Sequence, residues 1–147
     1  MKAYFDTSAF AAILFEDDRW QHIADWIEAQ QTQGCFSDFG WGEFVSAVGM
    51  RVRLGRMPAA EARDFLDVVS PGLRGWTRVE IVPADIAAAT ALLSEFALGL
   101  RLPDAIHIAV AQRLGLTLVS TDIRQVRAAA SLGVAAINPL QPDGTPS

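Results

Sequence analysis

Four acidic side chains occur at positions where a parallel α/β fold places its functional groups. They are Asp6, Glu43, Asp104 and Asp122. Each lies just after an apolar run of strand character, or near the start of a helix that adjoins such a run. Because functional groups gather beyond the carboxyl ends of parallel strands, we expect carboxylates from four separated segments to meet at one edge of a sheet.

Carboxylates that meet in this way indicate a particular chemistry. Four negative charges packed together repel one another unless a cation lies between them. Oxygen ligands without a Cys or His cluster favour Mg²⁺ or Mn²⁺ over zinc. Such an ion lowers the pKa of a coordinated water and neutralises charge on a phosphate and its leaving oxygen. The composition of the site therefore indicates phosphodiester cleavage.

Each acid also has a purely structural interpretation. Asp6, Asp104 and Asp122 stand where a helix N-cap or first-turn acid belongs, and the helix dipole favours negative charge there. Glu43 differs, because it adjoins a helix face that is otherwise apolar. That face carries Trp41, Phe44, Val45 and Val48. A carboxylate buried beside it requires either an arginine partner or a cation.

An alternation of strands and helices is expected to position these acids. Apolar runs predict strands at 3–5, 34–37, 77–82, 116–119 and 134–137. Helical spacing and caps predict helices at 7–15, 17–31, 38–54, from Pro58 onward, 83–98, 103–114 and 122–132. This order is typical of a three-layer α/β/α sandwich with a central, mainly parallel sheet and right-handed crossovers.

Several residues near the acids are candidates for supporting roles. Ser8 and Ser120 each lie two residues from one of the acids. Their hydroxyls either position a carboxylate, a water or a phosphate, or serve as ordinary turn and cap groups. Arg101, three residues before Asp104, is the best candidate for a phosphate contact.

Other polar residues have stronger structural than functional interpretations. His107 could partner one of the acids, but a packed or solvent-facing histidine is the expectation. Arg51, Arg53 and Arg56 lie at the end of helix 38–54, where the helix dipole favours cations. Because that end is remote from the expected site, we interpret them as dipole partners rather than as phosphate contacts.

The segments around the four acids resemble the acidic motifs of PIN-domain proteins. They read Tyr4-Phe5-Asp6-Thr7-Ser8-Ala9, Gly42-Glu43-Phe44, Leu102-Pro103-Asp104-Ala105-Ile106-His107-Ile108-Ala109 and Leu118-Val119-Ser120-Thr121-Asp122. The end of the body fits as well, so the resemblance runs to Pro139. Among PIN-domain proteins, the compact single-domain form is similar to VapC-type toxins of toxin–antitoxin pairs.

The resemblance implies a PIN-like fold and a Mg²⁺- or Mn²⁺-dependent endoribonuclease. Under it, Asp6, Glu43, Asp104 and Asp122 are the catalytic and metal-binding acids, with Asp6 and Asp104 foremost as direct ligands. It also implies a structured RNA substrate such as tRNA or ribosomal RNA, a homodimer, and a VapB-type antitoxin whose tail occupies a groove beside the site. Residues 56–81 match no family motif, which leaves substrate choice and partner contacts open there.

Two functions of other classes stay open. One is a phospho-transfer α/β domain. A dehalogenase-type phosphatase would have an acid two residues after Asp6, where Ser8 stands, and a receiver domain would need a late lysine, whereas Lys2 is the only lysine. The other is a non-catalytic binding module whose acids serve only as helix caps, and metal titration distinguishes it from a nuclease.

Composition limits the class of protein further. The chain has 147 residues, of which 51% are hydrophobic and 20% charged, so it can fold and is not disordered. No apolar run approaches the roughly 20 residues of a membrane span, and the first residues lack a signal-peptide stretch. We therefore expect a cytoplasmic protein without membrane contact. The net charge of −5 argues against simple electrostatic binding of nucleic acid, unless the acids form one metal site.

The division of the chain follows from its last residues. The body shows neither an internal repeat nor a linker, which favours one PIN domain over residues 1–139. Residues 140–147 are rich in Pro and polar side chains and are predicted to form a loose tail. Cys35 is the only cysteine, which excludes an internal disulfide and a zinc-type cysteine cluster.

Overall fold

Five parallel strands form the sheet of the computed structural model, which describes residues 1–141 apart from the side chains of residues 71 and 72. The strands are β1 (Lys2–Phe5), β2 (Gln33–Ser37), β3 (Thr77–Val79), β4 (Thr117–Val119) and β5 (Ala136–Ile137). Their order in space is β3-β2-β1-β4-β5, and each neighbouring pair is parallel. All the carboxyl ends therefore lie at one side of the sheet, which we name the carboxyl edge.

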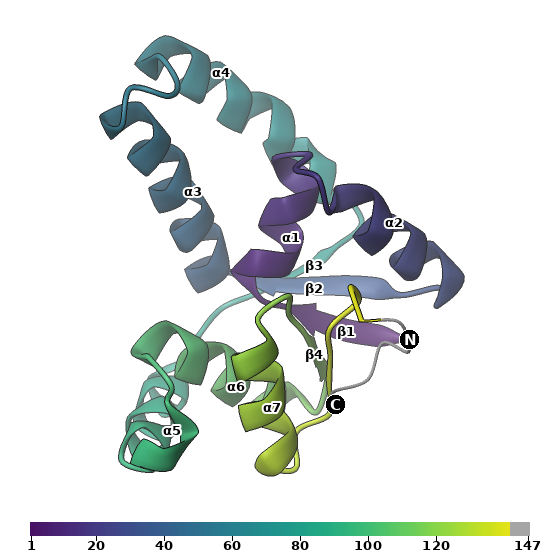
Figure 1. The fold of residues 1–147 in the computed structure, drawn as a ribbon, viewed down its shortest axis with the longest axis vertical. Helices are drawn as coiled ribbons and strands as arrows, with labels where there is room; N and C mark the ends of the chain where they lie inside the picture. The colour runs from purple at the N-terminus through teal and green to yellow at the C-terminus, as the bar shows by residue number, and fades with distance from the viewer. Residues whose placement is uncertain (142–147) are drawn as a thin grey trace.

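Helices cover both faces of this sheet (Figure 1). They are α1 (Thr7–Leu14), α2 (Trp20–Ala29), α3 (Asp38–Arg53), α4 (Ala59–Val69), α5 (Pro83–Leu93), α6 (Leu102–Leu114) and α7 (Ile123–Ser131), with short 3-10 helices η1 (Ser70–Leu73) and η2 (Phe96–Leu98). Helices α1 to α4 lie on one face, where α3 and α4 form a long hairpin, and α5 to α7 lie on the other. The predicted three-layer sandwich is confirmed.

The central strand β1 joins two apolar cores because its side chains alternate between the faces. Ala3 and Phe5 point into the core beneath α1 and α3, where they meet Phe44. Tyr4 points into the opposite core beneath α6 and α7, which contains Ile108. Burying each large side chain of this kind stabilises the fold by about 1.5–3 kcal/mol. Tyr4 is the exception in chemistry, since it carries a polar hydroxyl into an apolar layer.

Strand pairing brings distant residues together at the carboxyl edge. Phe5 lies opposite Val119, and the backbone N–H of Asp6 donates to the Val119 carbonyl at 3.0 Å. This bond places Asp6 next to Ser120, just beyond β4. On the other side of β1, Ser37 ends β2 and caps α3 by accepting from the Gly40 N–H at 2.9 Å. The starts of α1, α3 and α7 consequently share this edge.

The boundaries of three predicted elements were wrong. The helix predicted over 83–98 ends at Leu93 and is followed by η2, whose C-cap Gly99 has a φ of +64°. The strand predicted over 77–82 ends at Val79, because the Ile81 N–H donates to Asp38 Oδ1 rather than to the sheet. The helix predicted over 17–31 begins at Trp20, because Asp17 holds the preceding residues in a turn.

The end of the described chain is anchored to the carboxyl edge. Asn138 is buried, and its side-chain amide lies 3.5 Å from the Thr121 carbonyl. Most of the predicted tail, residues 142–147, lies outside the described residues, so the division at residue 139 stays a prediction. Within residues 1–141, we find no helix with the length and apolar character needed to cross a bilayer.

Candidate active site

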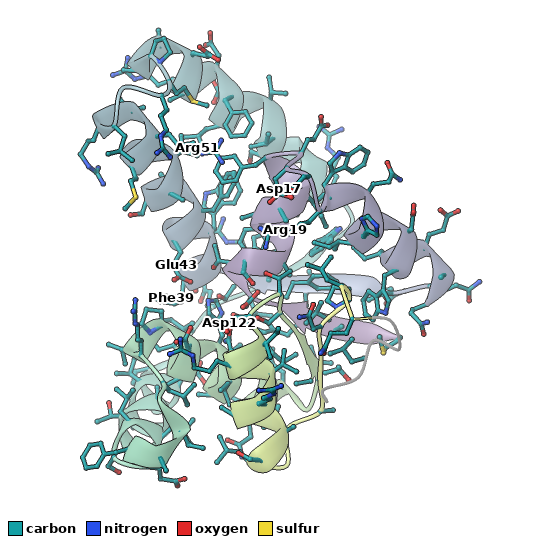
Figure 2. All side chains as sticks on the ribbon, in the orientation of Figure 1. Asp17, Arg19, Phe39, Glu43, Arg51 and Asp122 are labelled. Atoms are coloured by element: carbon teal, nitrogen blue, oxygen red, sulfur yellow. The ribbon has the colours of Figure 1, made fainter. Side chains whose placement is uncertain are left out.

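The four predicted acids line one small hollow at the carboxyl edge. Its volume is about 140 Å³. The lining residues are Asp6, Thr7, Ser8, Glu43, Asp104, His107, Asp122 and Gln125. Figure 2 shows Glu43 on α3 and Asp122 at the start of α7 on either side of this edge. Thus the sequence-based prediction of a common edge holds for the placement of all four acids.

Asp6 is the most buried of these acids, with 3% of its surface exposed. Its Oδ1 accepts from Ser8 Oγ at 2.6 Å and from the Ala9 N–H at 3.0 Å, and its Oδ2 accepts from Ser120 Oγ at 2.6 Å. Burial raises the pKa of this carboxyl above its ordinary value, and these donors and His107 oppose the rise only in part. The ionised form of Asp6 is therefore costly until a cation reaches it.

Ser8 and Ser120, predicted as supporting residues, both contact Asp6. Ser8 Oγ also accepts from the Thr121 N–H at 3.2 Å, and Ser120 Oγ accepts from the Asp122 N–H at 3.0 Å. Each hydroxyl therefore joins the loop after β4 to the carboxylate after β1. Because each carboxylate oxygen is held by at least one donor, the rotamer of Asp6 is fixed at the wall of the hollow.

Glu43 is held from two sides. Its Oε1 accepts from Thr7 Oγ1 at 2.7 Å and from His107 Nε2 at 2.6 Å. Burial alone would raise its pKa, but these hydrogen bonds and the charge of His107 outweigh it, so the pKa of Glu43 lies below its ordinary value. No arginine pairs with Glu43 in the described residues, which removes the ion-pair interpretation considered from the sequence.

Asp104 and Asp122 serve as helix caps and still leave an oxygen available. Asp104 Oδ2 accepts from the Arg101 N–H at 3.2 Å, and Asp122 Oδ1 accepts from the Arg124 and Gln125 N–H groups. The second oxygen of each carboxylate makes no hydrogen bond within residues 1–141. The capping and ligand interpretations are therefore compatible, because a carboxylate has more lone pairs than a cap uses.

The donor set fits a hard divalent cation. Carboxylate and hydroxyl oxygens line the hollow, and these are the ligands that Mg²⁺ and Mn²⁺ prefer. Among the described residues, no cationic side chain is bonded to the buried Asp6. As they stand, however, no three Asp, Glu, His or Cys side chains of the described chain have the spacing of a finished metal site.

Two arginines lie beside the acids in an adjoining hollow of about 250 Å³. Arg101 and Arg124 line it together with Asp104 and Asp122. The backbone N–H groups of Arg101 and Arg124 donate to these acids. Their guanidinium groups make no salt bridge in the part of the chain described. Both cations are consequently available to an external anion next to the acidic site.

A separate hollow of about 430 Å³ extends from Glu43 along α3 and includes Arg51 and Arg56 in its lining. The Arg51 guanidinium lies 3.6 Å from the centre of the ring of Phe15, the residue that ends α1. The interpretation of these arginines as partners of the helix dipole stays a prediction.

Sequence reasoning missed part of the site. His107 is buried, as expected, but it bonds Glu43 rather than packing passively. Tyr4 and Gln125 were not predicted as site residues. Gln125 lines the hollow, and its side-chain amide donates to the Asp104 carbonyl at 3.3 Å. For Tyr4, the available signal was a polar hydroxyl in an otherwise apolar strand, which requires a buried partner.

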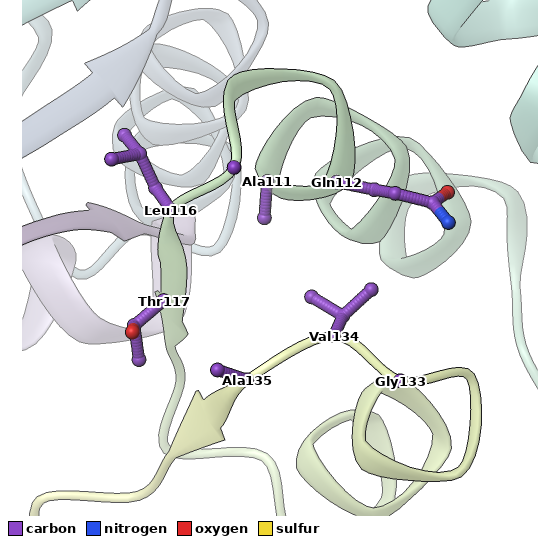
Figure 3. A pocket seen from close by; sticks show the side chains of 8 residues that line it. Ala111, Gln112, Leu116, Thr117, Gly133, Val134 and Ala135 are labelled. Atoms are coloured by element: carbon purple, nitrogen blue, oxygen red, sulfur yellow. The ribbon is translucent and has the colours of Figure 1, made fainter.

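Another hollow lies at the opposite edge of the sheet and carries no comparable chemistry (Figure 3). Its volume is about 270 Å³, and it lies where Leu116 and Thr117 start β4 and Val134 and Ala135 lead into β5. Its lining has no titratable side chain. The carboxyl edge is therefore the better candidate for an active site.

The fold and the hollow define a parallel α/β/α protein with an acidic pocket at the carboxyl edge. Its residues 3–131 match the sequence model of the PIN domain, so the chain belongs to the PIN domain family. A comparison with curated proteins finds no significant match.

Solved structures share the fold over nearly the whole chain. A toxin–antitoxin complex from Klebsiella pneumoniae is 23% identical at a TM-score of 0.64, covering 95% of this chain and 98% of that one. FitAcB from Neisseria gonorrhoeae is 16% identical at 0.71, covering 95% and 98%. The sarcin–ricin-loop-cleaving toxin VapC20 from Mycobacterium tuberculosis is 16% identical at 0.65, covering 90% and 96%. At these identities the likeness establishes a common fold.

Proposed function

We propose that the protein is a Mg²⁺- or Mn²⁺-dependent endoribonuclease, the toxin of a toxin–antitoxin pair. The observation that carries the proposal is the meeting of Asp6, Glu43, Asp104 and Asp122 in one hollow of a PIN-family chain. A cap-only role explains Asp104 and Asp122 but not Glu43, which caps nothing and is held at the hollow by two donors. The cleavage of the sarcin–ricin loop that is named for one structural neighbour supports an RNA substrate.

The residues of the chain would act as follows. Asp6 and Asp104 would hold the cation, with Glu43 and Asp122 contributing their free oxygens. When bound, the divalent ion would supply charge neutralisation at the phosphate and a lower pKa for the attacking water. Ser8 and Ser120 would keep Asp6 in place, which reduces the reorganisation needed during reaction. We expect products with 5′-phosphate and 3′-hydroxyl ends.

Arg101 and Arg124 would bind a phosphate beside the one that is cleaved. Their guanidinium groups flank the acids and lack salt-bridge partners in the described chain. Arginine presents several donors in a planar fork that matches phosphate oxygens. This local pair of cations also explains how a chain of net charge −5 can bind a polyanion. The substrate class that fits is structured RNA such as tRNA or ribosomal RNA.

A VapB-type antitoxin is the proposed partner, and a homodimer the proposed assembly. Support comes from the neighbours, several of which are complexes of a toxin with its antitoxin. The hollow that begins at Glu43 and continues past the exposed Met50 and Leu54 offers an apolar seat for an antitoxin tail. A small reading frame next to the gene should encode a protein that copurifies with this chain and inhibits it.

The test is cleavage of total RNA by the purified protein, with the ends of the fragments sequenced. We expect cleavage at few sites with Mn²⁺ or Mg²⁺ and none with EDTA. Asp104→Asn should reduce the rate at least a hundredfold while the circular dichroism spectrum stays unchanged. Cleavage that persists in EDTA, or at the wild-type rate in Asp104→Asn, would refute the proposal.

A further inference from the structure

A line of buried polar groups crosses the sheet and ends at Glu43. The Gly40 N–H donates to Ser37 Oγ at 2.9 Å, and Ser37 Oγ lies 2.8 Å from the Tyr4 hydroxyl. The Tyr4 hydroxyl lies 2.7 Å from His107 Nδ1, and His107 Nε2 lies 2.6 Å from Glu43 Oε1. We name Ser37, Tyr4 and His107 the relay; its members come from β2, β1 and α6.

When His107 is neutral, the chemistry of the two ends fixes the direction of every bond in the relay. An ionised Glu43 can only accept, so His107 must donate from Nε2. A neutral imidazole then carries no proton on Nδ1, so the Tyr4 hydroxyl must donate to it. The Tyr4 oxygen in turn accepts from the Ser37 hydroxyl, whose oxygen accepts from the Gly40 N–H. Each group has one proton and one place to donate it.

Burial shows that the relay is more than packing. Tyr4 and Ser37 are 0% exposed, and His107 is 3% exposed. Buried hydroxyl and imidazole groups are costly unless each one is bonded, and Phe or Leu would fill the same space without that cost. The ring of His107 is further confined by Phe39, at a centroid distance of 5.4 Å. Its Nε2 is thereby directed at the one oxygen of Glu43 that Thr7 also holds.

We propose that His107 is a positioning residue for Glu43, and that Tyr4 and Ser37 stabilise the tautomer that lets it act. By occupying Oε1, the relay leaves Oε2 of Glu43 free, since Oε2 makes no hydrogen bond within the described residues. Outer partners of this kind typically change metal affinity 10–100-fold when they are removed. The claim about metal affinity rests on the proposed function, whereas the claim about the tautomer does not.

The tautomer can be read directly by ¹⁵N NMR of the imidazole rings. The chain has two histidines, and His22→Gln would leave His107 as the only signal. At about pH 9, where ordinary imidazoles are neutral, we expect a proton on Nε2 and a bare Nδ1. In Tyr4→Phe the ring should shift to a mixture of tautomers. A proton on Nδ1 in the wild type, or no change in Tyr4→Phe, would overturn the relay.

Calorimetric titration with Mn²⁺ tests the positioning role. His107→Leu should bind Mn²⁺ about tenfold more weakly, whereas His107→Gln, whose amide can still donate, should stay close to the wild type. Equal affinity in His107→Leu and the wild type would overturn the positioning role alone. A wild-type protein that binds no Mn²⁺ would instead overturn the proposed function, so the two failures are distinguishable. The variants His107→Leu and His107→Gln also allow the proposal to be tested if Tyr4→Phe does not fold.

Discussion

At the scale of single residues, the acids of the site serve both the fold and the proposed chemistry. Asp6 and Asp122 cap α1 and α7, and Asp104 caps the start of α6. From the sequence, capping and metal binding were competing interpretations of the same residues. The structure removes the competition, because each cap engages only part of the carboxylate. Aspartate favours the start of a helix, and in this fold those helix starts lie where the parallel strands end.

Asp6 predicts an unusual dependence of stability on pH. Its pKa is raised by burial, so the folded state binds this proton more tightly than the unfolded state. The stabilising contribution is therefore complete below about pH 4 and is lost as the pH rises through the folded pKa. Metal-free Asp6→Asn, which has no charge to bury, should melt about 2–4 °C above the wild type at pH 7.

Thermal unfolding with and without Mn²⁺ checks this prediction. Mn²⁺ should raise the Tm of the wild type and leave that of Asp6→Asn nearly unchanged, because the ion is what relieves the buried charge. Ser8→Ala removes one donor to Asp6 without removing its charge and serves as a control that should not melt higher. An Asp6→Asn variant less stable than the wild type in EDTA would show that this carboxylate is structural.

At the scale of elements, the strands and their alternation with helices could be predicted because apolar runs are local signals. All five strands and the helix order match the prediction. Boundaries failed where a side chain from elsewhere decided them, as when Asp38 takes the Ile81 N–H and ends β3. Sequence reasoning also did not predict the hydrogen bond between His107 and Glu43, because two residues 64 positions apart leave no local pattern in the sequence.

Gly34 shows how an element is fitted to its neighbour. A Cβ at this position of β2 would lie 2.4 Å from the ring of Trp76, which packs on Phe5 at a centroid distance of 4.7 Å. Trp76 thus packs over β1 and β2. Gly34→Ala should lower the free energy of unfolding by about 2–3 kcal/mol in urea denaturation.

Gly42→Ala provides a matched control for that substitution. Gly42 lies in α3 next to Glu43, and a Cβ there would meet nothing within 4 Å. Because alanine favours a helix interior, this variant should be more stable by about 0.5–1 kcal/mol. Equal stability of Gly34→Ala and the wild type would mean that Trp76 does not pack on β2 as described.

At the scale of the whole molecule, the distribution of charge matters more than its sum. The chain carries a net −5, yet four of its 17 acids gather at the hollow. Arg101 and Arg124, which make no salt bridge within the described residues, flank them. The double variant Arg101→Gln/Arg124→Gln should weaken RNA binding and make it less sensitive to salt. Losing two phosphate contacts should reduce the slope of log K against log salt by roughly 1.4.

Fluorescence anisotropy with a single-stranded RNA across a salt series measures this slope. Arg63→Gln, an exposed position on α4 away from the carboxyl edge, removes one charge and should leave the slope nearly unchanged. The same slope in the double variant and the wild type would assign phosphate binding to other cations, such as Arg51 and Arg56 in the hollow that includes Glu43.

The most direct test of the account is Mn²⁺ binding to the wild type and to four single variants, measured by isothermal calorimetry. The variants are Asp6→Asn, Glu43→Gln, Asp104→Asn and Asp122→Asn. We predict saturable binding by the wild type and at least tenfold weaker binding by each variant, since all four carboxylates share the ion. Wild-type affinity in all four variants, or no binding by the wild type itself, would contradict the account.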